Sequence, residues 1–417
     1  MTLQVNQERL WRDVMALGDI TERDKPYTRQ AFTPMFHAGR AWLAEQFEQA
    51  GLAVRLDAVG NLIGRLEGDA MARDKTIWML GSHSDTVLGG GRFDGIAGVL
   101  AALEITRTIQ EQNVSLCRPL EIVDFLAEEP NLFGGSCVGS RAMAGALPPE
   151  MLNGRAVCNG QDITLAEAIR QCGGRPEAIP AMPRRDIHAF FELHIEQGPV
   201  LEASHHDIGV VTAIVCIRRM EIHLKGETDH VGTMPMSIRR DAAAAAADVM
   251  VWIRRQAEGL SQEGHGHFTA TVGVVEIQPN AVNVVPEHAR LRLDIRSETP
   301  EMMDRFTEGL KQALTDITAR LRVSLETFHI LSDAPAAQCD KALQAQLSQT
   351  ARTLGYSAMP MASGAGHDAA FLSRIARMAM VFIPCRQGKS HGESEWSAPD
   401  ALAKGANVIL NTLIIPK

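Results

Sequence analysis

The sequence has few cysteines, and their arrangement predicts neither a disulfide framework nor a cysteine metal site. The seven cysteines among 417 residues are odd in number and are scattered without a single CxxC pair. This pattern is typical of free thiols in a reducing compartment. None of the seven is a strong candidate for a metal ligand or a nucleophile. They are Cys117, Cys137, Cys158, Cys172, Cys216, Cys339 and Cys385.

The sequence also lacks an excess of basic charge and any long apolar run. Its net charge is −9, with 41 Lys and Arg against 50 Asp and Glu, so it has no electrostatic footprint for nucleic acid or for an anionic membrane surface. Residues 1–30 mix acidic, basic and polar side chains and lack the apolar core of a secretory signal, and no apolar run reaches membrane-spanning length. We therefore predict a cytoplasmic protein that binds neither nucleic acid nor membranes.

The length and composition predict a folded protein of two domains. A single core stops growing near roughly 250–300 residues, whereas this chain has 417 residues, of which 45% are hydrophobic and 22% charged. Up to about residue 215, amphipathic stretches such as Met35–Ala50 alternate with short apolar runs such as Leu120–Leu126. This alternation predicts an α/β domain in which helices flank a mixed, largely parallel sheet.

The pattern changes between residues 216 and 329, where alternating runs are interleaved with two long helical stretches, Ile238–Gln256 and Pro300–Leu321. This indicates an inserted α+β domain of ferredoxin-like type. The rhythm of helix and strand returns after residue 330 and ends in a helix expected over Pro399–Leu413. We therefore predict a discontinuous domain of residues 1–215 and 330–417 around the inserted domain of residues 216–329.

Imidazole and carboxylate side chains stand directly after several of the apolar runs. Ligands of α/β sheets gather at the carboxyl ends of strands, and histidine with carboxylate is a usual donor set for zinc and related ions. A single histidine in such a place is more often a hydrogen-bonded structural residue, but so many buried charged groups need a cation or a partner to neutralise them. The candidate residues are His83, Asp85, Asp94, Glu128, Glu129, His194 and His391.

Seven motifs in their order along the chain resemble the metal-dependent M20 peptidase/amidase superfamily, in its hydantoinase/carbamoylase branch. The resemblance covers nearly the whole chain. It implies an amidohydrolase that acts on non-peptide C–N bonds with two divalent ions per subunit, either zinc or manganese, cobalt or nickel. The motifs are Gly81-Ser-His-Ser-Asp-Thr86, Gly90-Gly-Arg-Phe-Asp-Gly95, Glu128-Glu129, Glu192-Leu-His-Ile-Glu-Gln-Gly198, Pro279-Asn-Ala-Val-Asn-Val284, Ser363-Gly-Ala-Gly-His-Asp368 and Ser390-His391.

The resemblance implies a role for each residue of the expected metal centre. Asp94 would bridge the two ions, and the other ligands would be His83, Glu129, His194 and His391. A water bound between the ions would then be the nucleophile.

Two neighbouring residues would support this chemistry. Glu128, which stands beside a ligand, would take the proton of the water and later deliver it to the leaving nitrogen. Asp85, two residues after His83, is expected to accept the second imidazole N–H and so to orient that ligand.

The resemblance also implies residues for the substrate. His230 would stabilise the developing oxyanion, in many members of the family in the active site of the partner subunit. Asn283 and Arg296 would hold the substrate carboxylate, which suits the planar guanidinium of arginine. Gln197 and Gly366 would line the same pocket.

The sequence leaves the substrate open within this family. Pro130 after Glu129 is closer to ureidoglycolate-cleaving enzymes, whereas Gly226–Met236 is more like allantoate and carbamoyl-amino-acid enzymes. We expect a homodimer, joined through the inserted dimerisation and lid domain, that hydrolyses an N-carbamoyl amino acid or a related small ureido acid with a carboxylate. The alternatives are a ureidoglycolate or allantoate amidohydrolase, an aminoacylase or dipeptidase of the same superfamily, or a non-catalytic binding protein that retains the fold.

Overall fold

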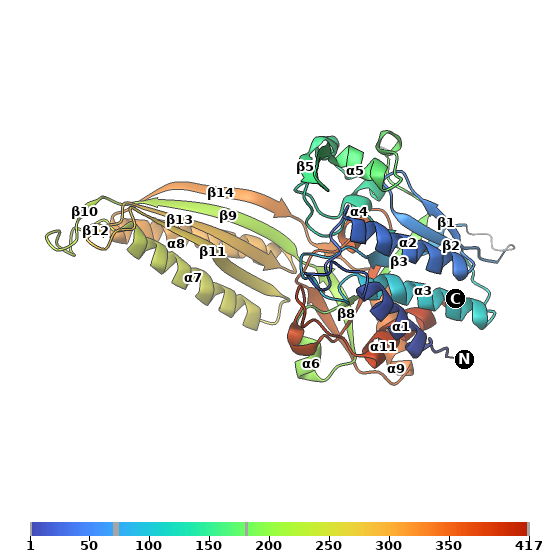
Figure 1. The fold of residues 1–417 in the computed structure, drawn as a ribbon. Helices are drawn as coiled ribbons and strands as arrows, with labels where there is room; N and C mark the ends of the chain where they lie inside the picture. Colours follow the sequence, from blue (N-terminus) through green and yellow to red (C-terminus); the bar gives the residue numbers. More distant parts are fainter. Residues whose placement is uncertain (1, 70–74, 180–181, 415–417) are drawn as a thin grey trace. The chain divides into compact units, whose positions relative to one another are not determined.

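The structure is a computed structural model that describes residues 2–69, 75–179 and 182–414. The chain forms two compact units (Figure 1). Unit 1 comprises the chain up to Thr212, Gln338–Met361 and the chain from Gly366 onward, and unit 2 comprises Ala213–Ala337 with Ala362–Ala365. Unit 2 is therefore inserted into unit 1. Its roles as a lid and in dimerisation stay predictions.

A mixed sheet forms the centre of unit 1. Its strand order is β1-β2-β4-β3-β7-β17-β8-β15, and β16 pairs with β8. The strands β4, β3, β7 and β17 run parallel to their neighbours in this order, whereas β1, β2 and β8 pair in the antiparallel direction. The strands are β1 (Ala53–Leu56), β2 (Leu62–Leu66), β3 (Ile77–His83), β4 (Leu120–Phe125), β7 (Ile187–Ile195), β8 (Ile208–Ile214), β15 (Ala337–Gln338), β16 (Ala358–Ser363) and β17 (Arg377–Ile383).

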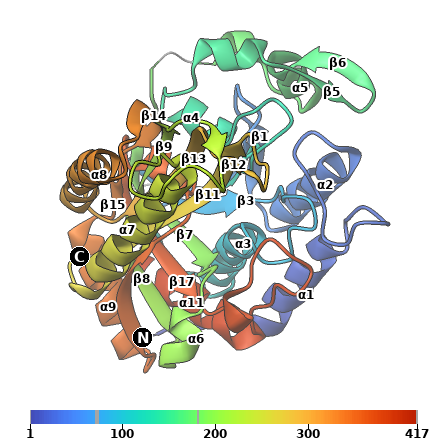
Figure 2. The same cartoon turned by 90° about the vertical axis from the view of Figure 1, so that its left-hand side faces the viewer.

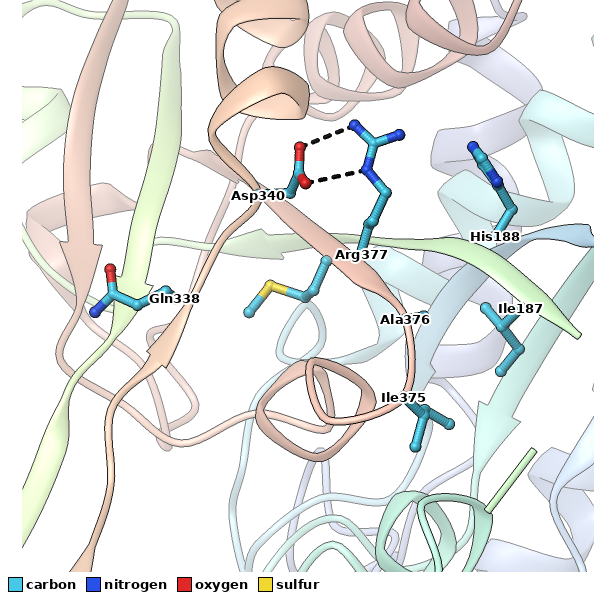
Figure 3. Close-up of a pocket in the computed structure, with 8 residues that line it drawn as sticks. Ile187, His188, Gln338, Asp340, Ile375, Ala376 and Arg377 are labelled. Carbon is cyan, nitrogen blue, oxygen red and sulfur yellow. Dashed lines mark hydrogen bonds and ion pairs between the residues drawn. The ribbon is translucent and has the colours of Figure 1, made fainter. Parts of the chain in front are cut away.

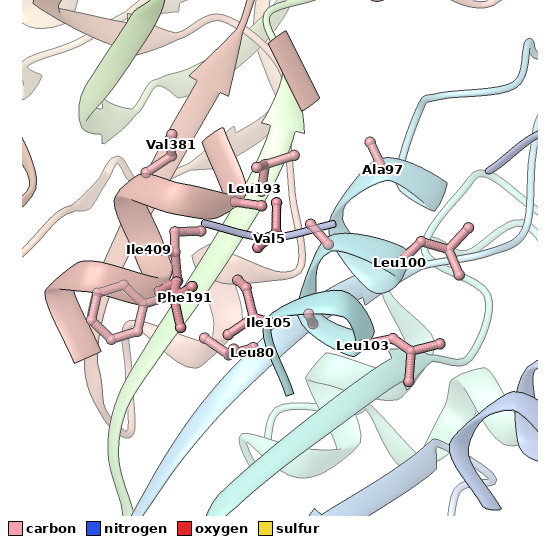
Figure 4. Close-up of a cluster of buried hydrophobic side chains, with 14 of the residues drawn as sticks. Val5, Leu80, Ala97, Leu100, Leu103, Ile105, Phe191, Leu193, Val381 and Ile409 are labelled. Atoms are coloured by element: carbon pink, nitrogen blue, oxygen red, sulfur yellow. The ribbon is translucent and has the colours of Figure 1, made fainter. Parts of the chain in front are cut away.

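Helices cover the sheet because its parallel strands are apolar on both faces. Every residue of β3 and of β4 is buried, as expected for parallel strands between two layers of helices. Figure 4 shows one such layer, in which Leu80, Leu103, Phe191, Val381 and Ile409 come from five different elements of the sheet and its helices. The helices of unit 1 are α1 (Gln7–Gly18), α2 (Pro34–Gln49), α3 (Ile96–Glu111), α4 (Val138–Met143), α5 (Leu165–Gln171), α6 (Val200–Ser204), α9 (Lys341–Thr353), α10 (Ala369–Leu372) and α11 (Pro399–Leu413).

Unit 2 is an antiparallel sheet with two long helices on one face (Figure 2). The strand order is β11-β13-β9-β14, and the chain order β-α-β-β-α-β is that of the ferredoxin-like fold. The inner face of the sheet packs residues such as Ile222 and Leu293 against the helices. The elements are β9 (Cys216–Lys225), α7 (Ala242–Gln262), β11 (Phe268–Gln278), β13 (His288–Ser297), α8 (Pro300–Leu321) and β14 (Ser324–Ala334), with a short ribbon of β10 (Asp229–His230) and β12 (Val284–Val285).

One expected helix is displaced along the chain. The stretch predicted over Ile238–Gln256 is a helix that begins at Ala242 and ends at Gln262. Asp241 explains the later start, because its side chain accepts the backbone N–H of Ala244 at 3.0 Å and caps the helix. The two helices expected over Pro300–Leu321 and Pro399–Leu413 have those bounds.

The remaining elements are short. They are the ribbon of β5 (Arg155–Cys158) and β6 (Gln161–Thr164) and the 3₁₀ turns η1 (Pro149–Asn153), η2 (Pro176–Ala178) and η3 (Arg386–Gly388). Among the described residues, none of the helices combines the length and the apolar character that a membrane crossing requires.

Candidate metal centre

The expected metal ligands all come from the carboxyl ends of parallel strands or from the loops beside them. His83 is the last residue of β3, and His194 is the last but one of β7. Glu129 follows β4, Asp94 stands just before α3, and His391 follows β17. Because β3, β4, β7 and β17 are parallel, their carboxyl ends meet at one edge of the sheet.

At this edge the other four side chains gather around Asp94. One oxygen of Asp94, Oδ1, lies 3.5 Å from Nε2 of His83 and 3.3 Å from Nε2 of His194. The other oxygen, Oδ2, lies 3.4 Å from Nε2 of His391, which is itself 3.3 Å from Oε1 of Glu129. These five residues form two donor groups that share Asp94, and a third group, Glu192, His194 and His367, overlaps the first at His194.

The charges at this edge fit the binding of divalent metal ions. Each donor group places its ligand atoms within 4.8 Å of one another, and the imidazole and carboxylate donors are those that zinc prefers. Burial and the neighbouring Asp94 raise the pKa of Glu129 to about 7. Burial and the carboxylate of Glu129 likewise raise the pKa of Glu128 well above its ordinary value. A cation would relieve this crowding of carboxylates.

Asp85 connects His83 with the two glutamates. The backbone carbonyl of Asp85, rather than its carboxylate, lies 3.0 Å from Nδ1 of His83, while the carboxylate oxygen Oδ1 lies 3.6 Å from this nitrogen. The carboxylate accepts the backbone N–H groups of Glu128 at 3.2 Å and Glu129 at 3.1 Å. The hydrogen-bond partner of His83 is thus the backbone of Asp85 and not the predicted carboxylate, which holds the backbone of the Glu128–Glu129 pair.

Strained backbone positions gather around the cluster. Ala127, Gln197 and His391 have φ values of 52°, 57° and 54°, in the left-handed region that residues with a side chain rarely adopt. Each stands at or next to a residue of the candidate site. Such strain persists where the surrounding structure holds the backbone firmly, and it concentrates at functional sites.

Gln197 faces the cluster with both ends of its amide. Its Nε2 donates to Oδ2 of Asp94 at 2.5 Å. Its Oε1 is buried, with no hydrogen-bond partner in the part of the chain that the structure describes. A buried acceptor without a partner is costly, so this oxygen fits an N–H group of a ligand. Gly366, the other residue expected to line the pocket, has open space where a side chain would begin.

The substrate residues expected in unit 2 lie at two ends of its sheet. His230 of β10 is paired with Val284 of β12, and the backbone carbonyl of Asn283 accepts the N–H of Val231 at 3.4 Å. Arg296 lies near the other end of β13, where Nη1 donates to the carbonyl of Gly364 at 2.6 Å. At about 3.4 Å per residue, His288 and Arg296 are roughly 27 Å apart along β13. One copy of unit 2 therefore does not bring Asn283 and Arg296 together, and their roles at the substrate stay predictions.

Buried polar groups that were not predicted support His194. Glu192 lies on the same face of β7, accepts the hydroxyl of Ser82 at 2.6 Å and accepts the N–H of Ala369 at 3.2 Å. The ring of His367 packs edge-on against that of His194, with centroids 4.5 Å apart. Glu192, two residues before His194 on a strand, could have been placed on this face from the period of two. The position of His367 beside His194 depends on tertiary packing, and the neighbouring residues in the sequence do not indicate it.

A cavity lies away from the candidate metal centre, at the amino-terminal ends of β7 and β17 (Figure 3). It has a volume of about 570 Å³ and is lined by the starts of β7 and β17, including His188 and Arg377. Its charged residues are engaged with each other: Asp340 accepts two hydrogen bonds from Arg377, at 3.0 and 2.9 Å. This cavity therefore contains no convergence of donors like that around Asp94.

Histidines and carboxylates that meet at the carboxyl edge of a mixed α/β sheet form a candidate site for divalent metal ions. The model of peptidase family M20/M25/M40 matches residues 79–414. The chain belongs to this family.

Three known proteins show how far the similarity extends. The chain is 36% identical over 412 residues to the N-carbamoyl-L-amino acid amidohydrolase of Geobacillus stearothermophilus, a match that covers 98% of each chain. It is 32% identical over 421 residues to the ureidoglycolate hydrolase of Arabidopsis thaliana, covering 99% of this chain and 87% of the relative. The crystal structure of an amidase of the hydantoinase/carbamoylase family from Burkholderia multivorans superposes with a TM-score of 0.90 at 32% identity and covers 99% of this chain and 98% of that one. The chain is a hydrolytic enzyme of the amidohydrolase kind.

Proposed function

We propose that the chain hydrolyses the ureido group of an N-carbamoyl amino acid or a related ureido acid. The reaction would consume water and release ammonia, carbon dioxide and the amino acid. The observation that carries the proposal is the pair of donor groups that share Asp94, because each of them could hold one divalent ion. His83 and His194 would complete one place, and Glu129 and His391 the other. Zinc suits these donors, and manganese, cobalt or nickel also bind such sets.

Divalent ions bound here would supply a Lewis acid that polarises the scissile carbonyl and makes water easier to deprotonate. Glu128 is the residue for proton transfer. It belongs to neither donor group, it is buried, and its Oε2 lies 3.6 Å from Nε2 of His83. The high pKa of its carboxyl group, caused by burial and by Glu129, suits a group that takes a proton from water and passes it to the leaving nitrogen.

The substrate would be recognised by a glutamine and an arginine. The free Oε1 of Gln197 would accept an N–H of the ureido group, and Gly366, which has open space where a side chain would begin, would line the same pocket. Arg296, held by Asp294 and by the carbonyl of Gly364, would bind the carboxylate. Because His230 and Asn283 lie at the far end of the same sheet, we propose that a partner subunit supplies them, with His230 as donor to the developing oxyanion. This assigns unit 2 to dimerisation.

The test is hydrolysis of a panel of substrates by the full chain loaded in turn with each of the four metals, measured as release of ammonia from the ureido substrates and as release of free amino acid from the acetyl amino acids and dipeptides. The panel contains N-carbamoyl amino acids, ureidoglycolate, allantoate, N-acetyl amino acids and dipeptides. We expect turnover of ureido acids and little of the N-acetyl amino acids and dipeptides. Turnover restricted to dipeptides or acetyl amino acids would contradict the ureido assignment, and no turnover by the metal-loaded protein would favour a binding protein. We further propose a cytoplasmic location, supported by seven cysteines that are all free thiols.

A further inference from the structure

Glu395 is a buried carboxylate that binds the two loops of the candidate metal centre together. Its side chain is 1% exposed. Its Oε1 accepts the backbone N–H groups of Phe93 at 2.7 Å and Asp94 at 3.1 Å. Its Oε2 accepts the hydroxyl of Ser390 at 2.9 Å. Glu395 therefore joins the loop that carries Asp94 to the loop that carries His391, two segments about 300 residues apart in the sequence.

The hydroxyl of Ser390 links Glu395 directly to the side chain of Asp94. Its Oγ lies 2.7 Å from Oδ2 of Asp94 and 2.9 Å from Oε2 of Glu395. A serine hydroxyl has only one proton to donate, so the two carboxylates share a single donor between them. The orientation of the Asp94 carboxylate consequently depends on the position of Glu395.

The backbone beside Asp94 is shaped to receive this carboxylate. Gly91 has a φ of 102°, and a Cβ added there would lie 2.3 Å from Oε1 of Glu395. The ring of Phe93 packs edge-on against that of Trp396, the residue after Glu395, with centroids 5.6 Å apart. The carboxylate of Glu395 is thus held by close contact with Gly91 and by the packing of Phe93 against Trp396.

We infer that Glu395 is a positioning residue for the metal centre: it holds Asp94 and the loop of His391 in the arrangement in which both donor groups can close around their ions. The inference rests on the metal site of the proposed function. Asp94 belongs to both donor groups, so a displacement of its loop weakens both at once. Groups that orient metal ligands in this way typically change the metal affinity by 10–100-fold when they are removed.

The test is the affinity of the metal-free, full-length protein for Zn²⁺ and for Mn²⁺, measured by titration against a competing chelator. We expect Glu395→Ala to bind both ions roughly 10–100-fold more weakly than the wild type. Glu395→Gln keeps an oxygen that can accept both backbone N–H groups, so it should lose only a few-fold. A residue that mattered for folding alone would lower the stability and leave the affinity of the folded protein unchanged.

Glu104→Ala is the matched control. Glu104 is also fully buried and also joins distant segments, because it accepts the N–H of Asn6 at 3.0 Å and Nε of Arg9 at 2.7 Å. It contacts no residue of the two donor groups, so its variant should bind metal within about twofold of the wild type. Thermal unfolding of the metal-free proteins shows which variants are folded.

The outcomes are distinct. If Glu395→Ala and Glu395→Gln both bind the ions as tightly as the wild type, the inference is overturned. If Glu395→Ala does not fold, Glu395→Gln decides, and an unchanged affinity of that variant overturns the inference as well. A wild type that binds metal but hydrolyses no ureido acid would remove the proposed substrate and leave the role of Glu395 intact. A wild type that binds no divalent ion would remove both.

Discussion

Gly95 packs directly against the imidazole of His83. A Cβ at Gly95 would lie 2.4 Å from Cε1 of that ring, and the φ of Gly95 is 65°. We expect Gly95→Ala to push His83 away from Asp94 and to lower kcat/KM by roughly 100-fold, the effect of a misplacement of about 1 Å at a reacting centre. Gly89 is the matched control, since it has a φ of 64° but open space around it. Gly89→Ala should lose stability through backbone strain and keep its metal content. Equal losses in both variants would show that strain, not contact with His83, is responsible.

Glu128 is expected to transfer protons without holding metal. Glu128→Gln keeps the shape of the side chain and its contact with the sulfur of Cys137, which lies 3.4 Å from Oε1. We expect turnover to fall by roughly 10²–10⁴-fold, the usual contribution of general acid–base catalysis, while the metal content by elemental analysis stays at the wild-type value. Glu104→Gln, a buried glutamate outside the cluster, serves as control. Activity retained within about tenfold would exclude Glu128 as the base.

Removal of metal is expected to destabilise unit 1. Ions that bind only the folded state raise the free energy of unfolding, by about 2.7 kcal/mol for one site when the free ion is at 100 times its Kd. Chelated protein should therefore melt at a lower temperature and should recover both melting temperature and activity when zinc, manganese, cobalt or nickel is added. Asp94→Asn alters the residue shared by both donor groups, so its melting temperature should rise much less when metal is added. A rise as large as that of the wild type would place the ions elsewhere.

The distance between His230 and Arg296 within unit 2 predicts complementation between subunits. Neither His230→Ala nor Glu128→Gln should be active alone. Mixed after dissociation and exchange, the two variants should recover up to about a quarter of the wild-type activity, because each heterodimer has one site with both residues intact. Mixing each variant with itself is the control. If exchange is demonstrated by labelled subunits and no activity returns, His230 acts within its own chain.

The ion pair of Asp340 and Arg377 predicts a dependence of stability on pH. Hydrogen bonds from Arg377 lower the pKa of Asp340 from its ordinary value of 3.8 to about 2. The stabilisation is therefore complete above about pH 4 and disappears as the pH falls towards 2. Asp340→Asn retains a helix cap and should be less stable than the wild type by about 1–2 kcal/mol at pH 6, a value reduced for partial exposure. The difference should shrink at pH 3.

The control for this prediction is an exposed ion pair of the same type. Arg155 and Asp162 lie 3.2 Å apart with both side chains more than half exposed, so Asp162→Asn should change the stability by less than about 0.5 kcal/mol at either pH. Urea unfolding at pH 6 and pH 3 measures all three proteins. A difference for Asp340→Asn that does not depend on pH would mean that the ion pair contributes nothing.

Much of the α/β arrangement could be predicted because its signals are local. The apolar run of β4 and the amphipathic stretch of α11, which begins with a proline, are visible in a few neighbouring residues. The polar residues at the ends of these strands lie at one edge of the sheet, so His83 and His194 could be predicted as metal ligands from the sequence. Helix α7 begins later than predicted because Asp241 caps its amino-terminal end.

Other parts of the site could not be predicted, since they depend on contacts between distant segments. Glu393 and Glu395 look alike in the sequence, yet one is exposed and the other buried against the loop of Asp94. The separation of Asn283 from Arg296 follows from strand β13, which keeps the chain extended from His288 to Ser297. The domain boundaries and the roles of the site residues stay predictions.

The position of β17 has a consequence for biosynthesis. This strand, Arg377–Ile383, lies between β7 and β8 in the finished sheet although the ribosome makes it after both of them. His391 is made later still. Until both have been made, the nascent chain has a gap in its sheet and lacks one candidate metal ligand. Divalent ions bound by all five candidate ligands could therefore stabilise only a chain that has been translated past His391.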